Sequence, residues 1–102
     1  MGYSINREVQ GLFEIFGGKQ NLIDSISATN FICDNDERTL EFVFLGGIYN
    51  SFMVKANDNG YYDMRFKDSV GEEVLKQEYY DDIEKNDVVA CFERVTDEYI
   101  ML

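Results

Sequence analysis

The stretch YNSFMVKANDNGYYDMRFK, residues 49–67, decides the fold. Apolar and polar residues alternate on both sides of the polar run 57–60, a period typical of strands that bury one face. Asn59-Gly60 between such segments indicates a two-residue hairpin turn, because both positions of that turn need a positive φ. We therefore expect antiparallel strands over 49–56 and 61–67. Their buried face would carry Phe52, Val54, Ala56, Tyr62, Met64 and Phe66.

Further strands are expected on either side of this hairpin, over 31–33, 39–45 and 73–80. Residues 34–38 and the pair Gly46-Gly47 read as turns between them. In 39–45, Leu40, Phe42 and Phe44 share one face. The opposite face of that segment is only partly polar, which predicts a central strand with some cover on both sides.

The two ends of the chain carry helical periodicity instead. Val9, Leu12, Phe13 and Phe16 form one stripe of a helix over 5–16, which Ser4 or Asn6 can cap and Gly17-Gly18 ends. A short helix over 20–27 follows. A third helix is expected to begin with Asn86 as its N-cap and to end at residues 96–98. Its stripe would be Val88, Cys91, Phe92 and Val95, and the apolar tail 99–102 should dock.

These elements predict a single α+β domain over residues 1–102. Short N-terminal helices precede an antiparallel meander of four to five strands, and a C-terminal helix packs on one face of the sheet. A length of 102 residues suits one domain with one core. Fifteen aromatic residues, seven Tyr and eight Phe, supply large buried area for that core.

The charge of the chain restricts its partners. Twenty acidic residues against nine basic ones leave a net charge of −11, which disfavours nucleic acid and anionic membranes and favours basic surfaces. The region 72–98 holds ten acidic and three basic residues, so the negative field concentrates in the last third. No secretory pattern opens the chain, and no apolar run approaches the ~20 residues of a membrane span. We expect a cytoplasmic protein.

The absence of histidine argues against most catalysis. It removes Ser–His and Cys–His dyads, an imidazole general base and the usual catalytic zinc sites. Cys33 and Cys91 each lie among apolar residues, which favours small buried hydrophobes over a disulfide. We expect no enzyme and no cofactor.

Several segments in order resemble a family. These are F16-G17-G18-K19, A28-T29-N30-F31, G60-Y61-Y62-D63-M64-R65-F66 and the C-terminal run from Phe92 to Leu102. Together they are similar to small uncharacterised proteins of bacteriophages and mobile elements. The resemblance implies a phage or mobile-element origin and a bacterial cytoplasm, and brings no activity with it. The family usually has Thr-Gly-Leu-Tyr where this chain has Thr96-Asp97-Glu98-Tyr99, so the helix exit and its surface can differ here.

The acidic run around residues 78–87 admits four interpretations. Its spacing does not match a Ca²⁺ loop, and nothing separates two carboxyl environments as glycoside hydrolysis needs. A solvated strand-to-helix connection is the plain interpretation. A recognition surface is the other, in which regularly spaced carboxylates imitate a nucleic-acid backbone and tyrosines add contact area. The residues expected to bind a partner are Glu78, Tyr79, Tyr80, Asp81, Asp82, Glu84, Asp87, Glu93, Asp97 and Glu98.

Two other motifs have features of binding sites. Gly17-Gly18-Lys19 lacks the Walker spacing and follows a helix, so it is interpreted as a helix end and a turn. Tyr61, Tyr62, Tyr79 and Tyr80 could stack bases, but strands are rich in tyrosine and the net charge opposes the binding of single strands.

The sequence thus favours a non-enzymatic acidic protein of phage type. It would bind a basic host protein, such as a nucleic-acid-handling or defence enzyme, and inhibit it by nucleic-acid mimicry. Direct nucleic-acid binding and membrane binding are not expected. The alternative is a self-associating structural or assembly protein, acting through an exposed edge strand or the apolar tail, and a homodimer is left open.

Overall fold

A computed structural model describes residues 6–102. Helices α1 (Arg7–Ile15) and α2 (Lys19–Ile26) precede five strands: β1 (Thr29–Asp34), β2 (Thr39–Val43), β3 (Ser51–Ala56), β4 (Tyr62–Val70) and β5 (Glu73–Ile83). A 3₁₀ turn, η1 (Lys85–Asp87), leads into α3 (Val88–Thr96). The strands form one antiparallel sheet in sequential order, β1-β2-β3-β4-β5. The expected α+β meander is confirmed.

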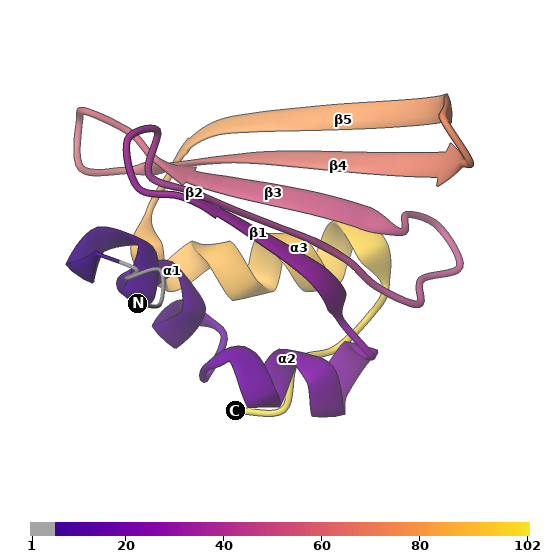
Figure 1. Ribbon diagram of the computed structural model, residues 1–102, viewed down its shortest axis with the longest axis horizontal. Coiled ribbons are helices and arrows are strands. Elements are labelled where there is room, and N and C mark those ends of the chain that lie inside the picture. The colour runs from indigo at the N-terminus through magenta and orange to yellow at the C-terminus, as the bar shows by residue number, and fades with distance from the viewer. Residues whose placement is uncertain (1–5) are drawn as a thin grey trace, which may run out of the picture.

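All three helices lie on one side of the sheet (Figure 1). Every second residue of the inner strands points to them, so that Leu40, Phe52 and Phe66 are at most 1% exposed. On the opposite face Val43 and Leu45 are 40% and 75% exposed. The cover expected on both sides of residues 39–45 is therefore wrong, because no described helix crosses the outer face.

Phe92 of α3 is the centre of the core. Its ring centroid lies between 5.0 and 6.5 Å from five other phenylalanine rings, those of Phe16, Phe42, Phe44, Phe52 and Phe66. These rings come from the end of α1, from β2 and the residue just after it, from β3 and from β4. One side chain therefore ties α3 to the sheet and to the first helix, and large aromatic area of this kind dominates the stability of small domains.

The first helix follows the sequence closely. Val9, Leu12, Phe13 and Phe16 are buried, and the Asn6 side chain accepts a hydrogen bond from the Val9 amide at 2.9 Å. The alternative cap Ser4 and the expected helix start at Ile5 lie outside the described residues. Gly17 and Gly18 have φ of 83° and 100°, which confirms the helix end and turn expected there.

The β3–β4 turn differs from the expected two-residue form. Asn59 does not adopt a positive φ, whereas Gly60 does at 84°. The Asn57 amide donates to the Tyr61 carbonyl, so the loop holds three residues with glycine at the left-handed position. The Asn57 side-chain oxygen accepts from the amides of Asn59 and Tyr61, which stabilises this wider turn.

The last third also departs from expectation. β5 continues to Ile83 rather than ending near residue 80, so residues 81–83 extend the strand, with Asp81 and Asp82 exposed on it. Asn86 lies inside η1, and α3 begins at Val88 without a side-chain cap. The expected Asn86 N-cap is wrong.

The two cysteines and the C-terminal tail behave largely as expected. Cys91 is buried, and Cys33 is half-buried against the core; both remain thiols. The tail docks through its backbone, because Asn21 Nδ2 donates to the Met101 carbonyl at 2.6 Å and the Met101 amide donates to Ser25 Oγ at 3.0 Å. None of the helices described between residues 6 and 102 has the length and apolar character needed to cross a membrane.

Candidate functional site: an acidic end of the sheet

The meander brings acidic segments that are far apart in sequence to one end of the sheet. In an antiparallel meander, alternate turns lie at the same end, so residues 34–38, 57–61 and 81–87 are neighbours (Figure 1). Neighbouring strands are about 4.8 Å apart, which spreads these segments over roughly 15–20 Å. We call this surface the acidic end. Its carboxylates are Asp34, Asp36, Glu37, Asp58, Asp81, Asp82, Glu84 and Asp87.

Part of this charge is neutralised within the chain. Arg38 forms ion pairs with Asp58 and, at 3.7 Å, with Glu8, while Lys55 pairs with Glu37 at 3.4 Å. The hydrogen bond to Arg38 lowers the pKa of Asp58. These turn carboxylates therefore remain charged but already have cationic partners.

Asn57 organises the middle of the acidic end. Its side-chain nitrogen donates to Asp63 Oδ1 at 3.0 Å and to Asp82 Oδ1 at 2.8 Å. Asp82 lies in a β-bulge, where Asp81 and Asp82 together oppose Asp63 of β4, and it has a φ of 56°. The Asp82 amide donates to Asp63 Oδ1 at 3.1 Å. These hydrogen bonds fix the conformation of the bulge, so Asp82 stabilises the fold locally.

The other predicted residues of β5 divide between the two faces of the sheet. Glu78 faces the helices and accepts hydrogen bonds from the hydroxyls of Tyr49 and, at 2.6 Å, Tyr80. These bonds lower the pKa of Glu78, and the bond to Glu78 raises the pKa of buried Tyr49 to about 12. Glu78 and Tyr80 therefore form hydrogen bonds within the chain, on the face of the sheet that packs against the helices.

Tyr79 and Asp81 lie on the outer face instead. The Arg65 guanidinium lies 5.4 Å from the Tyr79 ring centroid, and the Tyr79 hydroxyl donates to Gln77 at 2.7 Å. Tyr79 is 56% exposed. Tyr79 therefore offers exposed aromatic contact area on the same face as the Asp81 carboxylate.

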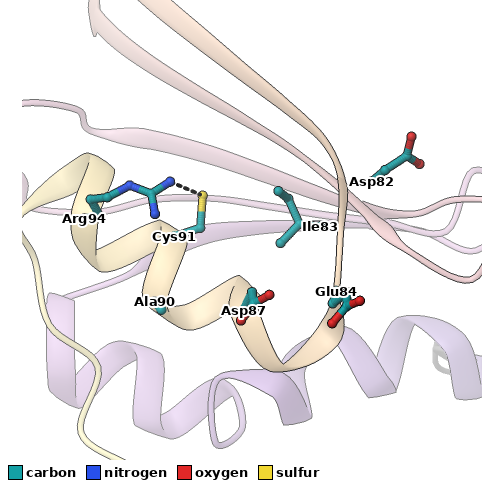
Figure 2. A pocket seen from close by; sticks show the side chains of 7 residues that line it. All are labelled: Asp82, Ile83, Glu84, Asp87, Ala90, Cys91 and Arg94. Atoms are coloured by element: carbon teal, nitrogen blue, oxygen red, sulfur yellow. Dashed lines mark hydrogen bonds between the residues drawn. The ribbon is translucent and has the colours of Figure 1, made fainter.

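A groove runs between the end of β5 and α3 (Figure 2). Its volume is about 390 Å³. Arg94 Nη2 donates to Cys91 Sγ at 3.6 Å, and the Asp82 carboxylate points away from that contact. Burial raises the pKa of the Cys91 thiol, so Cys91 is a poor nucleophile. The lining residues are Asp82, Ile83, Glu84, Asp87, Ala90, Cys91 and Arg94.

The groove combines carboxylates at its mouth with the Cys91 thiol and the Arg94 guanidinium. The carboxylates can attract cations. Among residues 6–102, no group of three His, Cys, Asp or Glu side chains is arranged to hold a metal ion. The candidate site therefore offers charge and contact area.

The remaining three predicted residues lie at the far end of α3. Glu93 Oε2 accepts from the Ile100 amide at 2.9 Å, and the Glu98 amide donates to Thr96 Oγ1 at 3.1 Å. Asp97 has a φ of 58° and ends the helix in the left-handed conformation that glycine usually supplies. The helix exit therefore has the left-handed geometry that glycine usually supplies.

Sequence reasoning missed the turn residues Asp36, Glu37 and Asp58 as members of one surface with Asp81. The signal was present, because a predicted meander already implies that every second turn shares one end of the sheet. A count of charges along the sequence does not show that these turns share one end of the sheet.

Comparison with protein-family models, with curated proteins and with solved structures finds no match. The functional argument therefore rests on the geometry of this chain.

Proposed function

We propose that this protein is a non-enzymatic binding module whose acidic end engages a basic surface of another protein. One observation carries the proposal. Asp36, Asp81, Glu84 and Asp87 are exposed at the same end of the sheet, and within residues 6–102 their side chains form no hydrogen bond or ion pair. Carboxylates without internal partners can bind a cationic surface with no bond to break first.

Nucleic-acid-handling proteins are the partner class that we propose. Their grooves are built to neutralise phosphates, which follow one another at about 3.4 Å per strand, and binding there releases counterions. Carboxylates spread over roughly 15–20 Å can occupy several of those cationic positions. Such occupation would inhibit the enzyme by blocking its groove. The resemblance to phage and mobile-element proteins supports a bacterial host enzyme as the target, including defence enzymes.

The test begins with a partner captured from bacterial lysate at low salt, then identified and purified. Its affinity for the wild-type chain should fall as salt rises, because screening weakens contacts between exposed charges. A DNA duplex should compete with the chain if the groove is the binding site. A partner whose affinity ignores both salt and DNA would contradict the proposal.

A matched pair of variants locates the surface. Asp81→Asn/Glu84→Gln/Asp87→Asn removes three charges from the acidic end. Glu14→Gln/Glu72→Gln/Glu73→Gln removes three charges elsewhere, from exposed positions on α1 and at the opposite end of the sheet. We expect the first triple variant to lose at least tenfold in affinity, mostly through slower association, and the second to lose far less. Equal losses would show that only net charge matters.

A further inference from the structure

The outer edge of β5 is the longest unpaired strand edge of the sheet. β5 has 11 residues and pairs with β4 on one side only. On its other side no element of the described chain lies alongside it (Figure 1). An edge strand presents unpaired amides and carbonyls, which are a template for pairing with another strand.

We propose that β5 pairs with β5 of a second copy of this chain, antiparallel, with Gln77 on the two-fold axis. Such pairing joins two five-stranded sheets into one continuous sheet and is isologous, as most dimer interfaces are. It uses the middle of β5. The acidic end, at the C-terminal end of the strand, is not required for it.

Charge selects this register. Lys76 and Glu78 face the same side of the sheet, because Lys76 Nζ lies 5.0 Å from the Tyr49 ring centroid and Glu78 accepts from the Tyr49 hydroxyl. With Gln77 on the axis, Lys76 of each copy stands opposite Glu78 of the other. Opposite charges in facing positions stabilise a strand pair, and like charges destabilise it.

The neighbouring registers lose this complementarity. A two-fold axis at residue 76 places Lys76 opposite Lys76, and an axis at residue 78 places Glu78 opposite Glu78. An axis halfway between residues would bring inner-face side chains opposite outer-face ones, which the pleat does not allow. Registers centred further toward the C-terminus run into the bulge at Asp82.

Exposed apolar side chains also favour this register. Tyr79 is 56% exposed and would lie across the axis from Leu75, which is 55% exposed and is the extra residue of a β-bulge opposite Asp68 and Ser69. Two features limit the affinity. The regular part of β5 is short, because the strand is irregular at residue 75 and again at residues 81–82, and each copy carries a net charge of −11. The dimer should therefore be weak at low salt and strengthen as salt screens the long-range repulsion.

Cysteine cross-linking tests the register. Facing residues of an antiparallel pair have Cα atoms about 4.5–5.5 Å apart, within disulfide range. Gln77→Cys should therefore cross-link copy to copy under mild oxidation, as read by mass spectrometry of the 77–77 peptide. Tyr79→Cys is the matched control, because its symmetry mate lies four residues along the strand, about 13 Å away. A Tyr79→Cys cross-link as fast as that of Gln77→Cys would overturn the register.

Charge exchange gives a second readout in the unmodified strand. Lys76→Glu should lower the dimer fraction in sedimentation velocity, and adding Glu78→Lys should restore it. A strict monomer at millimolar concentration and moderate salt would overturn the dimer while leaving partner capture untouched. Conversely, a dimer that strengthens with salt alongside a chain that captures no basic partner would sink only the proposed function.

Discussion

The two ends of α3 carry acidic residues that the sequence groups together, but the fold uses them differently. At the C-terminal end, Glu93 accepts the Ile100 amide and Asp97 closes the helix with a left-handed residue. At the N-terminal end, the Glu84 and Asp87 side chains form no hydrogen bond or ion pair within the described part of the chain. Whether an acidic side chain is free to bind a partner therefore depends on its internal hydrogen bonds and not on the number of carboxylates in its segment.

The largest expected effect comes from weakening the packing of α3 against the sheet. Phe92→Ala removes the ring that contacts five other phenylalanines at the centre of the core. We expect a loss of about 3–5 kcal/mol in the free energy of unfolding, measured by urea titration. Phe92→Leu, which keeps most of the volume, should cost less. Equal costs would show that the ring contacts contribute little.

A matched pair of variants tests the difference between the two ends of α3 directly. Glu93→Ala leaves the Ile100 amide without its acceptor and should cost about 1–2 kcal/mol of unfolding free energy. Asp87→Ala removes a side chain without an internal hydrogen bond and should change stability by less than about 0.5 kcal/mol. Urea titrations of both variants decide the matter. The account fails here if Asp87→Ala costs as much as Glu93→Ala.

Glu78 lies in the acidic run but, like Glu93, is hydrogen-bonded within the chain. The pH dependence of the unfolding free energy should reveal this bond. The folded-state pKa of Glu78 is lowered by the Tyr49 hydroxyl, so the stability of that bond is lost as pH falls from about 4.5 through the folded pKa. The pKa of Tyr49 is raised from 10.0 to about 12, so the same stability is also lost as pH rises through that range. Tyr49→Phe should therefore cost about 1 kcal/mol near pH 7 and less at both extremes. A cost independent of pH would contradict the assignment.

The smallest expected effect concerns the helix exit. Asp97 holds a φ of 58°, a conformation that is unfavourable for residues with a side chain. Asp97→Gly should raise the free energy of unfolding by about 0.5 kcal/mol, reduced by the loss of the Tyr99 hydroxyl bond to Asp97. Thermal unfolding of this variant and of Asp97→Ala provides the check. Asp97→Ala should destabilise, and a gain from both substitutions would point to charge instead of backbone strain.

Much of the fold could be predicted from local patterns. The helix stripes and alternating strands gave the correct element order, because period and burial are linked directly. Turn details could not be predicted, since the Asn57 side chain selects the wider β3–β4 loop through contacts that no local pattern reports. The length of β5 was also missed, because polar residues of an edge strand resemble a loop.

The candidate site could be predicted only in part. Asp81, Glu84 and Asp87 are exposed, as expected for ionised carboxylates, which are rarely buried without a partner. That they bind a partner stays a prediction. Glu78 accepts its hydrogen bond from Tyr49, which lies 29 positions away in the sequence. Glu93 accepts its hydrogen bond from Ile100 in the docked C-terminal tail. Such long-range hydrogen bonds follow from the assembled fold.

The most direct test of the account is the affinity of a purified basic partner for the wild-type chain and the two triple variants, measured at low and high salt. We predict that Asp81→Asn/Glu84→Gln/Asp87→Asn weakens binding at least tenfold at low salt and flattens the salt dependence. Glu14→Gln/Glu72→Gln/Glu73→Gln should keep most of the affinity. Tight binding by the first variant would contradict the claim that the acidic end is the binding surface.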